Sequence, residues 1–287
     1  MNQMARQAGT FRIGGDMEVC RMGYGAMRLT GEGVWGPPDD REEARRVLRR
    51  AIELGIDLID TADAYGPEVN EEIIAEALFP YPEGLVIATK VGNTRPGPGQ
   101  WVPDGRPGQL RARCEESLRR LRLEQIPLLQ LHFVDPKVPE DDQYAALAQL
   151  QKEGKVRHLG LSNVSVEQIE RAERHFRVTT VQNRYNVMER SSDDVVDYCA
   201  AKEIGFLPWF PLSTGKLATG GVLSAIAESR GATAAQVALA WLLQRSPVML
   251  PIPGTSKLAH LEENTAAAAP RLTDEEMRRL GELGSAA

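Results

Sequence analysis

Short apolar runs alternate with helical patterns of apolar residues along most of the chain. The run at 56–59 is rich in branched side chains and ends at Asp60, which is typical of a parallel strand buried on both faces. A helical pattern begins near Val69, and another apolar run follows it at 85–89. The pattern therefore predicts a repeated strand–helix unit.

Eight such units are predicted along the sequence. Strands are expected at 21–27, 56–60, 85–89, 126–131, 156–161, 178–182, 205–209 and 248–252. Helices are expected at 40–54, 69–78, 110–121, 144–152, 166–175, 193–202, 233–244 and 257–268, with one more after Thr273. A small hairpin precedes them at 11–13 and 17–20, and two glycines supply its turn.

Strict alternation of strands and helices predicts an α/β protein with a parallel sheet, and eight units favour closure into a (β/α)8 TIM barrel. An open Rossmann-type sheet is disfavoured, because no G-x-G-x-x-G turn follows the first strand. No low-complexity linker divides the chain. We therefore expect residues 1–287 to form a single barrel domain with an N-terminal hairpin and a terminal extra helix.

Composition and charge narrow the class of protein and leave the predicted fold unchanged. Apolar residues make up 42% of the chain and charged residues 26%, which is typical of a soluble globular protein. The net charge of −6 gives no sign of nucleic-acid binding, and no apolar run is long enough to span a membrane. Three scattered cysteines argue against a disulfide framework, and no metal-ligand spacing is present. We expect a cytoplasmic protein that acts on small molecules as a monomer or weak homo-oligomer.

Chemically active residues stand where three successive strands end. Asp60 ends the second strand and Tyr65 lies on its loop, while Lys90 and His132 follow the next two strands. Each has a commoner structural explanation when taken alone, such as a helix cap for Asp60 or the point where the chain meets water for Lys90. Because neighbouring strand ends of a barrel meet at one face, the set favours an active site.

These four side chains suit the reduction of a carbonyl group. A phenol with a pKa of about 10 is a weak acid at neutral pH. The Lys90 ammonium is expected to lower the pKa of Tyr65 towards the working range, while Asp60 keeps Lys90 charged and oriented. His132 can donate a hydrogen bond to the carbonyl oxygen. The set lacks a convincing nucleophile–base pair for acyl transfer.

The longest irregular stretches, at 30–39, 91–107, 133–142 and 213–221, all follow strands. They lie on the face of a barrel where active sites are found. Trp35 and Trp101 belong to the first two of these loops. Local packing is the commoner explanation for either residue alone, but two tryptophans on one face predict a substrate-binding wall.

A family resemblance rests on three places in the chain: the segment D-T-A-D-A-Y-G from Asp60 to Gly66, Lys90, and His132. They resemble the catalytic tetrad motifs of the aldo-keto reductases. The similarity continues in order along nearly the whole chain after the hairpin, which makes it specific. It implies reduction of aldehydes or ketones, with catalytic roles for Asp60, Tyr65, Lys90 and His132. It also implies NADPH as cofactor, with NADH as the alternative.

Further segments resemble those with which this family binds its cofactor. Ser162, Asn163 and Gln182 are similar to residues that hold the nicotinamide carboxamide, and Trp209 to an aromatic residue that stacks on the ring. A phosphate near Thr255–Lys257 makes physical sense, because hydroxyls, amides at a helix N-terminus and an ammonium form an anion site. The resemblance implies the following cofactor-binding residues: Gly25, Ala26, Met27, Ser162, Asn163, Gln182, Trp209, Phe210, Pro211, Leu212, Ser213, Gly215, Lys216, Ile252, Gly254, Thr255, Ser256, Lys257, His260, Glu263 and Asn264.

A narrower resemblance concerns the residues at 21–30 and 33–38. They are similar to a bacterial branch that includes pyridoxal reductases, also called pyridoxine 4-dehydrogenases. His260 stands where many members have an arginine on the 2′-phosphate, which keeps NADH as the alternative cofactor. The chain ends soon after its terminal helix, so we expect an open active site that accepts planar aromatic aldehydes, pyridoxal among them.

Two other functions are compatible with parts of this pattern. Some relatives keep the fold and a bound nicotinamide while serving as auxiliary subunits of channel proteins, but the complete tetrad disfavours this role. Alternatively, Lys90 could be the Schiff-base lysine of a barrel aldolase. The nicotinamide-site motifs would then have no explanation. We therefore predict an NADPH-dependent oxidoreductase.

Overall fold

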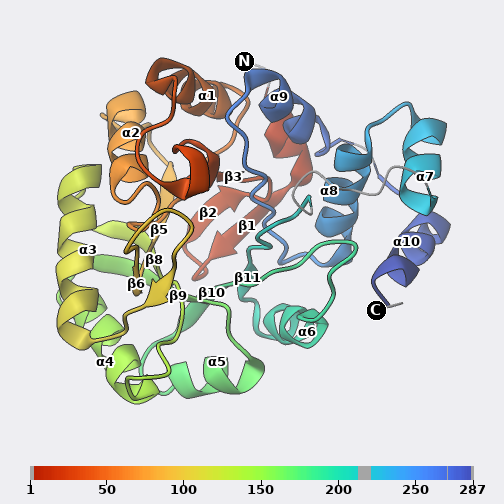
Figure 1. Cartoon of the computed structure of the whole chain (residues 1–287). Coiled ribbons are helices and arrows are strands. Elements are labelled where there is room, and N and C mark those ends of the chain that lie inside the picture. The colour runs from red at the N-terminus through yellow and green to blue at the C-terminus, as the bar shows by residue number, and fades with distance from the viewer. Residues whose placement is uncertain (1–2, 213–220, 270, 286–287) are drawn as a thin grey trace.

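The computed structural model describes residues 3–212, 221–269 and 271–285, and parallel strands lie at its centre (Figure 1). One curled sheet has the strand order β11-β10-β9-β8-β5-β4-β3. Each neighbouring pair is parallel, as expected when helices connect the strands. The strands are β3 (Tyr24–Gly25), β4 (Leu58–Asp60), β5 (Val86–Val91), β8 (Ile126–Leu131), β9 (Val156–Ser162), β10 (Val178–Gln182) and β11 (Gly205–Phe206). Separate hairpins are formed by β1 (Thr10–Ile13) with β2 (Met17–Cys20), and by β6 (Asn93–Thr94) with β7 (Val102–Pro103).

The segment predicted as an eighth strand, 248–252, closes the barrel without being a regular strand. On one side, the Phe206 amide donates to the Val248 carbonyl at 2.8 Å, and the Leu250 amide donates to the Phe206 carbonyl at 2.8 Å. On the other side, the Gly23 amide donates to the Pro251 carbonyl at 3.0 Å. Pro251 has no N–H to continue a ladder, so the segment pairs only through isolated bonds. The strands predicted at 21–27 and 205–209 are correspondingly shorter than expected.

Helices surround the strands, and α1 to α6 follow one another around the outside in chain order (Figure 1). They are α1 (Arg41–Glu53), α2 (Val69–Leu78), α3 (Pro107–Leu121), α4 (Glu140–Lys152), α5 (Val166–Ala172), α6 (Asp193–Lys202), α7 (Val222–Arg230), α8 (Ala234–Arg245), α9 (Leu258–Ala266) and α10 (Asp274–Gly281). Capping boxes at Thr233 and Thr273 begin α8 and α10, and the Asp40 side chain caps α1. Helix α7 was not predicted. None of the helices in the described ranges combines the length and apolar character needed to cross a membrane.

The barrel interior changes from apolar to polar along the strands. Near the strand starts, Leu58 and Val86 pack in one apolar cluster with residues of the β1–β2 hairpin, which covers that end of the barrel. Side chains two and four positions further along a strand point to the same side. Those inward-facing positions carry Asp60 and Lys90 at the opposite end. The fold therefore places charged groups at the C-terminal end of a barrel whose other end is closed.

Candidate active site

Asp60, Lys90 and Tyr65 form a hydrogen-bonded chain at the C-terminal end of the barrel. Lys90 Nζ donates to Asp60 Oδ2 at 2.7 Å and to the Tyr65 hydroxyl at 3.2 Å. The Thr61 carbonyl accepts a third bond at 2.9 Å, so all three N–H groups of the ammonium are used. Lys90 is fully buried, and Asp60 and Tyr65 are only 3% and 6% exposed. The structure thus brings three of the predicted catalytic residues into direct contact.

Two glutamines orient the Asp60 carboxylate. Its Oδ1 accepts from Gln182 Nε2 at 2.8 Å and, more weakly, from Gln130 Nε2 at 3.4 Å. The sequence assigned Gln182 to the cofactor alone and did not single out Gln130. The signal for Gln130 is present, however, because it is a polar residue at an inward-facing position of an otherwise apolar strand.

His132 lies beside Tyr65, outside this hydrogen-bonded chain. The two rings meet edge to face with centroids 6.0 Å apart. Burial, followed by the positive charges of Lys90 and Arg95, holds the pKa of His132 well below its ordinary value. The imidazole is therefore neutral at neutral pH, with one donor and one acceptor nitrogen. Its Nδ1 is buried and has no partner among the described residues.

The ionisation of the phenol and the ammonium differs from the prediction in one respect. Burial raises the pKa of Tyr65, and the Lys90 charge offsets only part of this effect, so the pKa stays above its ordinary value. The predicted direction of the Lys90 contribution is right, but a net pKa below the ordinary value is wrong because desolvation is larger. For Lys90 itself, burial lowers the pKa, but Asp60 and Tyr65 together raise it by more. The pKa of Lys90 therefore lies above its ordinary value, and the amine stays charged.

Of the two predicted tryptophans, only Trp101 contacts the catalytic rings. Its ring centroid lies 6.1 Å from that of Tyr65 and 5.8 Å from that of His132. Trp35 makes no ring contact with Tyr65 or His132. Both indole rings face the guanidinium of Arg95, whose Cζ is 3.7 Å from the Trp101 centroid and 5.8 Å from the Trp35 centroid. The sequence contained no signal for Arg95, because a lone arginine in a polar loop is usually solvated.

The predicted nicotinamide site presents groups of the right chemistry for a carboxamide. Trp209 Nε1 donates to Asn163 Oδ1 at 3.0 Å, and Asn163 Nδ2 donates to the His132 carbonyl and to Ser162 Oγ. The hydrogen of the Ser162 hydroxyl and the Gln182 Oε1 atom have no bonds to described residues. One donor and one acceptor therefore remain available, which matches the C=O and NH₂ of a carboxamide.

Next to this site, two glycines allow close backbone contact. A Cβ atom at Gly25 would lie 2.6 Å from the Ile252 carbonyl oxygen, and one at Gly254 would lie 2.6 Å from the Gly25 carbonyl oxygen. Beyond them, Thr255 Oγ1 accepts from the Lys257 amide at 3.1 Å. Lys257 is exposed and occupies the N-cap position of α9, which has no side-chain cap. An anion could therefore bind to the first turn of this helix.

The other predicted cofactor residues fall into three groups. Near the strand ends lie Ala26, Met27, Phe210, Pro211 and Leu212. On α9 or just before it lie Ser256, His260, Glu263 and Asn264. Outside the described residues lie Ser213, Gly215 and Lys216.

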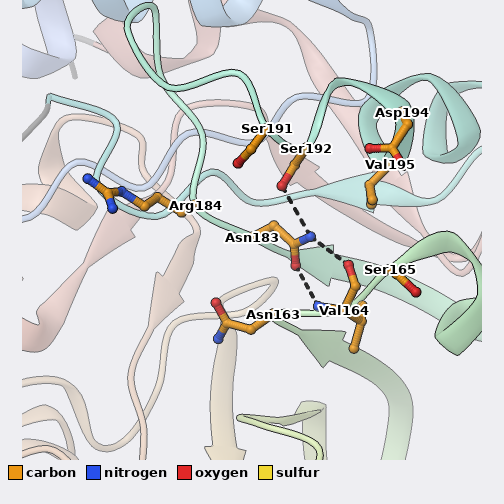
Figure 2. Close-up of a pocket in the computed structure, with 9 residues that line it drawn as sticks. All are labelled: Asn163, Val164, Ser165, Asn183, Arg184, Ser191, Ser192, Asp194 and Val195. Carbon is orange, nitrogen blue, oxygen red and sulfur yellow. Dashed lines mark hydrogen bonds between the residues drawn. The ribbon is translucent and has the colours of Figure 1, made fainter. Parts of the chain in front are cut away.

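A polar pocket of about 300 Å³ borders the nicotinamide site at Asn163. Figure 2 shows Asn183 at its centre, bonded to the backbone of Val164 and to Ser192, while the Asn163 side chain points the other way. None of the four predicted catalytic residues lines this pocket. Asn183 thus supports the loop that carries Asn163.

Comparison with known proteins supports this description. The model of the aldo/keto reductase family matches residues 21–285. An uncharacterized oxidoreductase of Schizosaccharomyces pombe is 52% identical over 281 residues, which cover 98% of this chain and 91% of that protein. Pyridoxine 4-dehydrogenase of Escherichia coli is 44% identical over 277 residues, covering 94% of this chain and 96% of that protein.

A solved structure adds to this. The aldo-keto reductase from Klebsiella pneumoniae, crystallised in complex with NADPH, has a TM-score of 0.80 and is 27% identical, covering 96% of this chain and 94% of that one. The matches confirm the predicted resemblance, the barrel fold and the oxidoreductase class. The predicted cofactor is the one with which the Klebsiella protein was crystallised.

Proposed function

The chain belongs to the aldo/keto reductase family, and we propose that it uses NADPH to reduce planar aromatic aldehydes, pyridoxal among them, to alcohols. The observation that carries this proposal is the buried chain Asp60–Lys90–Tyr65 beside a neutral His132. These groups supply a proton donor and a hydrogen-bond donor at one place. A carbonyl being reduced requires both.

Each catalytic residue has a distinct role in this proposal. Tyr65 gives its proton to the carbonyl oxygen as negative charge develops there. Lys90 stabilises the phenolate that remains, since its ammonium lies 3.2 Å from the hydroxyl. Asp60 keeps Lys90 charged and fixed. The neutral His132 donates a hydrogen bond to the same carbonyl oxygen and orients it.

The cofactor supplies the hydride when bound. Ser162 and Gln182 would hold its carboxamide with their remaining donor and acceptor, and Trp209 would pack against the nicotinamide ring. Thr255 and Lys257 would bind the 2′-phosphate at the start of α9. The three cysteines are free and buried, which suits the reducing cytoplasm where we propose the enzyme acts.

The substrate class is inferred from Trp101 and from one relative. A flat aldehyde can pack against the indole ring while its oxygen approaches Tyr65 and His132, because these three rings contact one another. Pyridoxine 4-dehydrogenase of Escherichia coli, the 44% identical relative, is named for pyridoxine, the alcohol that corresponds to pyridoxal.

A substrate panel tests the proposal. Steady-state rates with NADPH and with NADH are measured for pyridoxal, benzaldehyde and short aliphatic aldehydes. We expect higher kcat/KM for the aromatic aldehydes, and faster reduction with NADPH. Better reduction of every aliphatic aldehyde would overturn the substrate class. Cofactor binding without turnover of any carbonyl would instead favour the auxiliary-subunit function, and borohydride trapping of substrate on Lys90 would favour the aldolase.

A further inference from the structure

Arg95 is a buried cation that joins the three loops around the proposed substrate site. Its Nη1 donates to the Val34 carbonyl and to the Ala64 carbonyl, both at 3.0 Å. Its Nη2 donates to the Gly33 carbonyl at 2.8 Å, and its Nε donates to the Gln100 carbonyl at 2.7 Å. Four of the five N–H groups of the guanidinium are thus used by backbone carbonyls.

The acceptors belong to separate parts of the chain. Gly33 and Val34 precede Trp35, Ala64 precedes Tyr65, and Gln100 precedes Trp101. In each of the three loops, Arg95 therefore bonds the carbonyl of the residue directly before an aromatic residue of the site. The guanidinium also lies over the Trp101 ring, with Cζ 3.7 Å from its centroid. Bonds and ring contact together determine where the Trp101 ring can lie.

No described carboxylate pairs with this charge, although Arg95 is only 9% exposed. A buried arginine without an acidic partner is costly, and backbone carbonyls plus an aromatic face are what compensates it here. A residue needed only to close a loop would not require the planar, charged guanidinium group of arginine. The arrangement is specific to arginine, because a lysine ammonium has three donors and no planar face.

We propose that Arg95 is the specificity-determining positioning residue of this site, holding Trp101 against Tyr65 and His132 so that planar aromatic aldehydes are preferred. The inference rests on the proposed function, since it concerns the same substrate class. Arg95 acts through Trp101 and does not take part in hydride or proton transfer. Its loss should therefore affect aromatic substrates much more than aliphatic ones.

The test is a double-mutant cycle with Arg95→Gln and Trp101→Ala, using kcat/KM for pyridoxal, benzaldehyde and propanal. We expect each single variant to lower kcat/KM for the aromatic aldehydes by roughly tenfold, the range of a lost aromatic contact. The double variant should lose no more than Trp101→Ala alone, because both changes remove the same ring position. Propanal reduction should fall much less in all three variants.

Additional variants separate this role from general damage. Arg95→Lys keeps the charge but not the fork, so we expect the loss seen with Arg95→Gln. Arg106→Gln is the matched control, since Arg106 lies on the same loop and its exposed side chain pairs with Asp104 alone among the described residues. It should retain the wild-type preference. Thermal melting and NADPH binding are recorded for each variant.

Each result has a defined meaning. Additive losses in the double variant, equal losses for propanal and aromatic aldehydes, or an unchanged preference in Arg95→Gln would overturn the role of Arg95. Failure of both Arg95 variants to fold would also overturn it, because Arg95 would then be a stability residue. If the wild-type enzyme does not prefer aromatic aldehydes, the proposed substrate class fails on its own, before any variant is compared.

Discussion

At the scale of single residues, the Tyr65 hydroxyl is the atom on which the proposed chemistry depends. Burial keeps its pKa above the ordinary value, so it is protonated at neutral pH and can donate in the reductive direction. In alcohol oxidation the same oxygen must act as a base, and this requires the phenolate. The two directions should therefore depend differently on pH.

Replacing Tyr65 by phenylalanine keeps the ring and removes the proton donor. We expect kcat for aldehyde reduction to fall by roughly 10²–10⁴-fold, the range for general acid catalysis. The NADPH dissociation constant, measured by fluorescence quenching, should hardly change. Tyr198→Phe is a suitable control, because in the described part of the chain that hydroxyl bonds Glu173 alone, on the outer surface. Wild-type turnover in Tyr65→Phe, with chemistry rate-limiting, would exclude this role.

Replacing Lys90 by methionine should change the pH dependence of alcohol oxidation. Lys90 lowers the pKa of Tyr65 and Asp60 raises it, so removing the ammonium moves the pKa further upward. The phenolate then forms only at higher pH. We expect the pH–rate profile of the residual oxidation activity to move to higher pH. A profile in the wild-type position would show that Lys90 does not stabilise the phenolate.

At the scale of helices and strands, the regular apolar patterns were sufficient to predict most elements, and the two main differences have separate causes. The strand at 178–182 and the helix at 193–202 have the predicted bounds. The segment at 248–252 does not form a regular strand, because Pro251 has no N–H for a ladder and the bonds to Phe206 and Gly23 are isolated. Helix α7 is different. Leu223, Ile226 and Ala227 already show its helical spacing, so it could have been predicted.

For the candidate site, contacts between distant parts of the chain limited what could be predicted. Residues at strand ends could be predicted to meet, because neighbouring strands bring them together wherever the sheet is parallel. Arg95 could not, since its four acceptors are backbone carbonyls in three loops and leave no side-chain pattern in the sequence. The hydrogen bond from Gln182 to Asp60 could not be predicted for a similar reason. It depends on two strands on different sides of the barrel.

The start of α9 is the element that should distinguish the two cofactors. Lys257 is exposed there, and its amide bonds the Thr255 hydroxyl. Lys257→Ala should weaken NADPH more than NADH, because only NADPH carries the 2′-phosphate. A charge-assisted hydrogen bond contributes about 1.5–3 kcal/mol, so the preference should change by roughly tenfold or more. Dissociation constants from fluorescence titration measure it.

The control for this change is Lys152→Ala, at the end of α4, where no cofactor contact is proposed. It should leave both dissociation constants unaltered. Equal weakening of NADPH and NADH by Lys257→Ala would mean that this lysine supports the loop without recognising the phosphate.

At the scale of the whole molecule, the backbone contact that closes the barrel also borders the predicted cofactor site. The segment 248–252 lies between β11 and the chain before β3, and the close approach of Gly25 to Ile252 is part of this contact. The residues predicted to bind the phosphate, 255–257, follow this segment closely. Closing the barrel therefore also positions the loop at which the cofactor would bind.

Gly25→Ala tests this connection. The new Cβ would lie 2.6 Å from the Ile252 carbonyl oxygen, and a backbone atom cannot turn away as a flexible side chain can. We expect the free energy of unfolding in urea to fall by about 1–3 kcal/mol, as for other overpacked sites, and NADPH binding to weaken with it. Gly108→Ala is the matched control, because nothing lies within 4 Å of its new Cβ in α3. There the loss of backbone freedom in the unfolded chain should stabilise the protein by about 0.5–1 kcal/mol. If Gly25→Ala kept wild-type stability and NADPH affinity, the contact between Gly25 and Ile252 could widen without loss of free energy. Closure of the barrel would then not determine the geometry of the cofactor site.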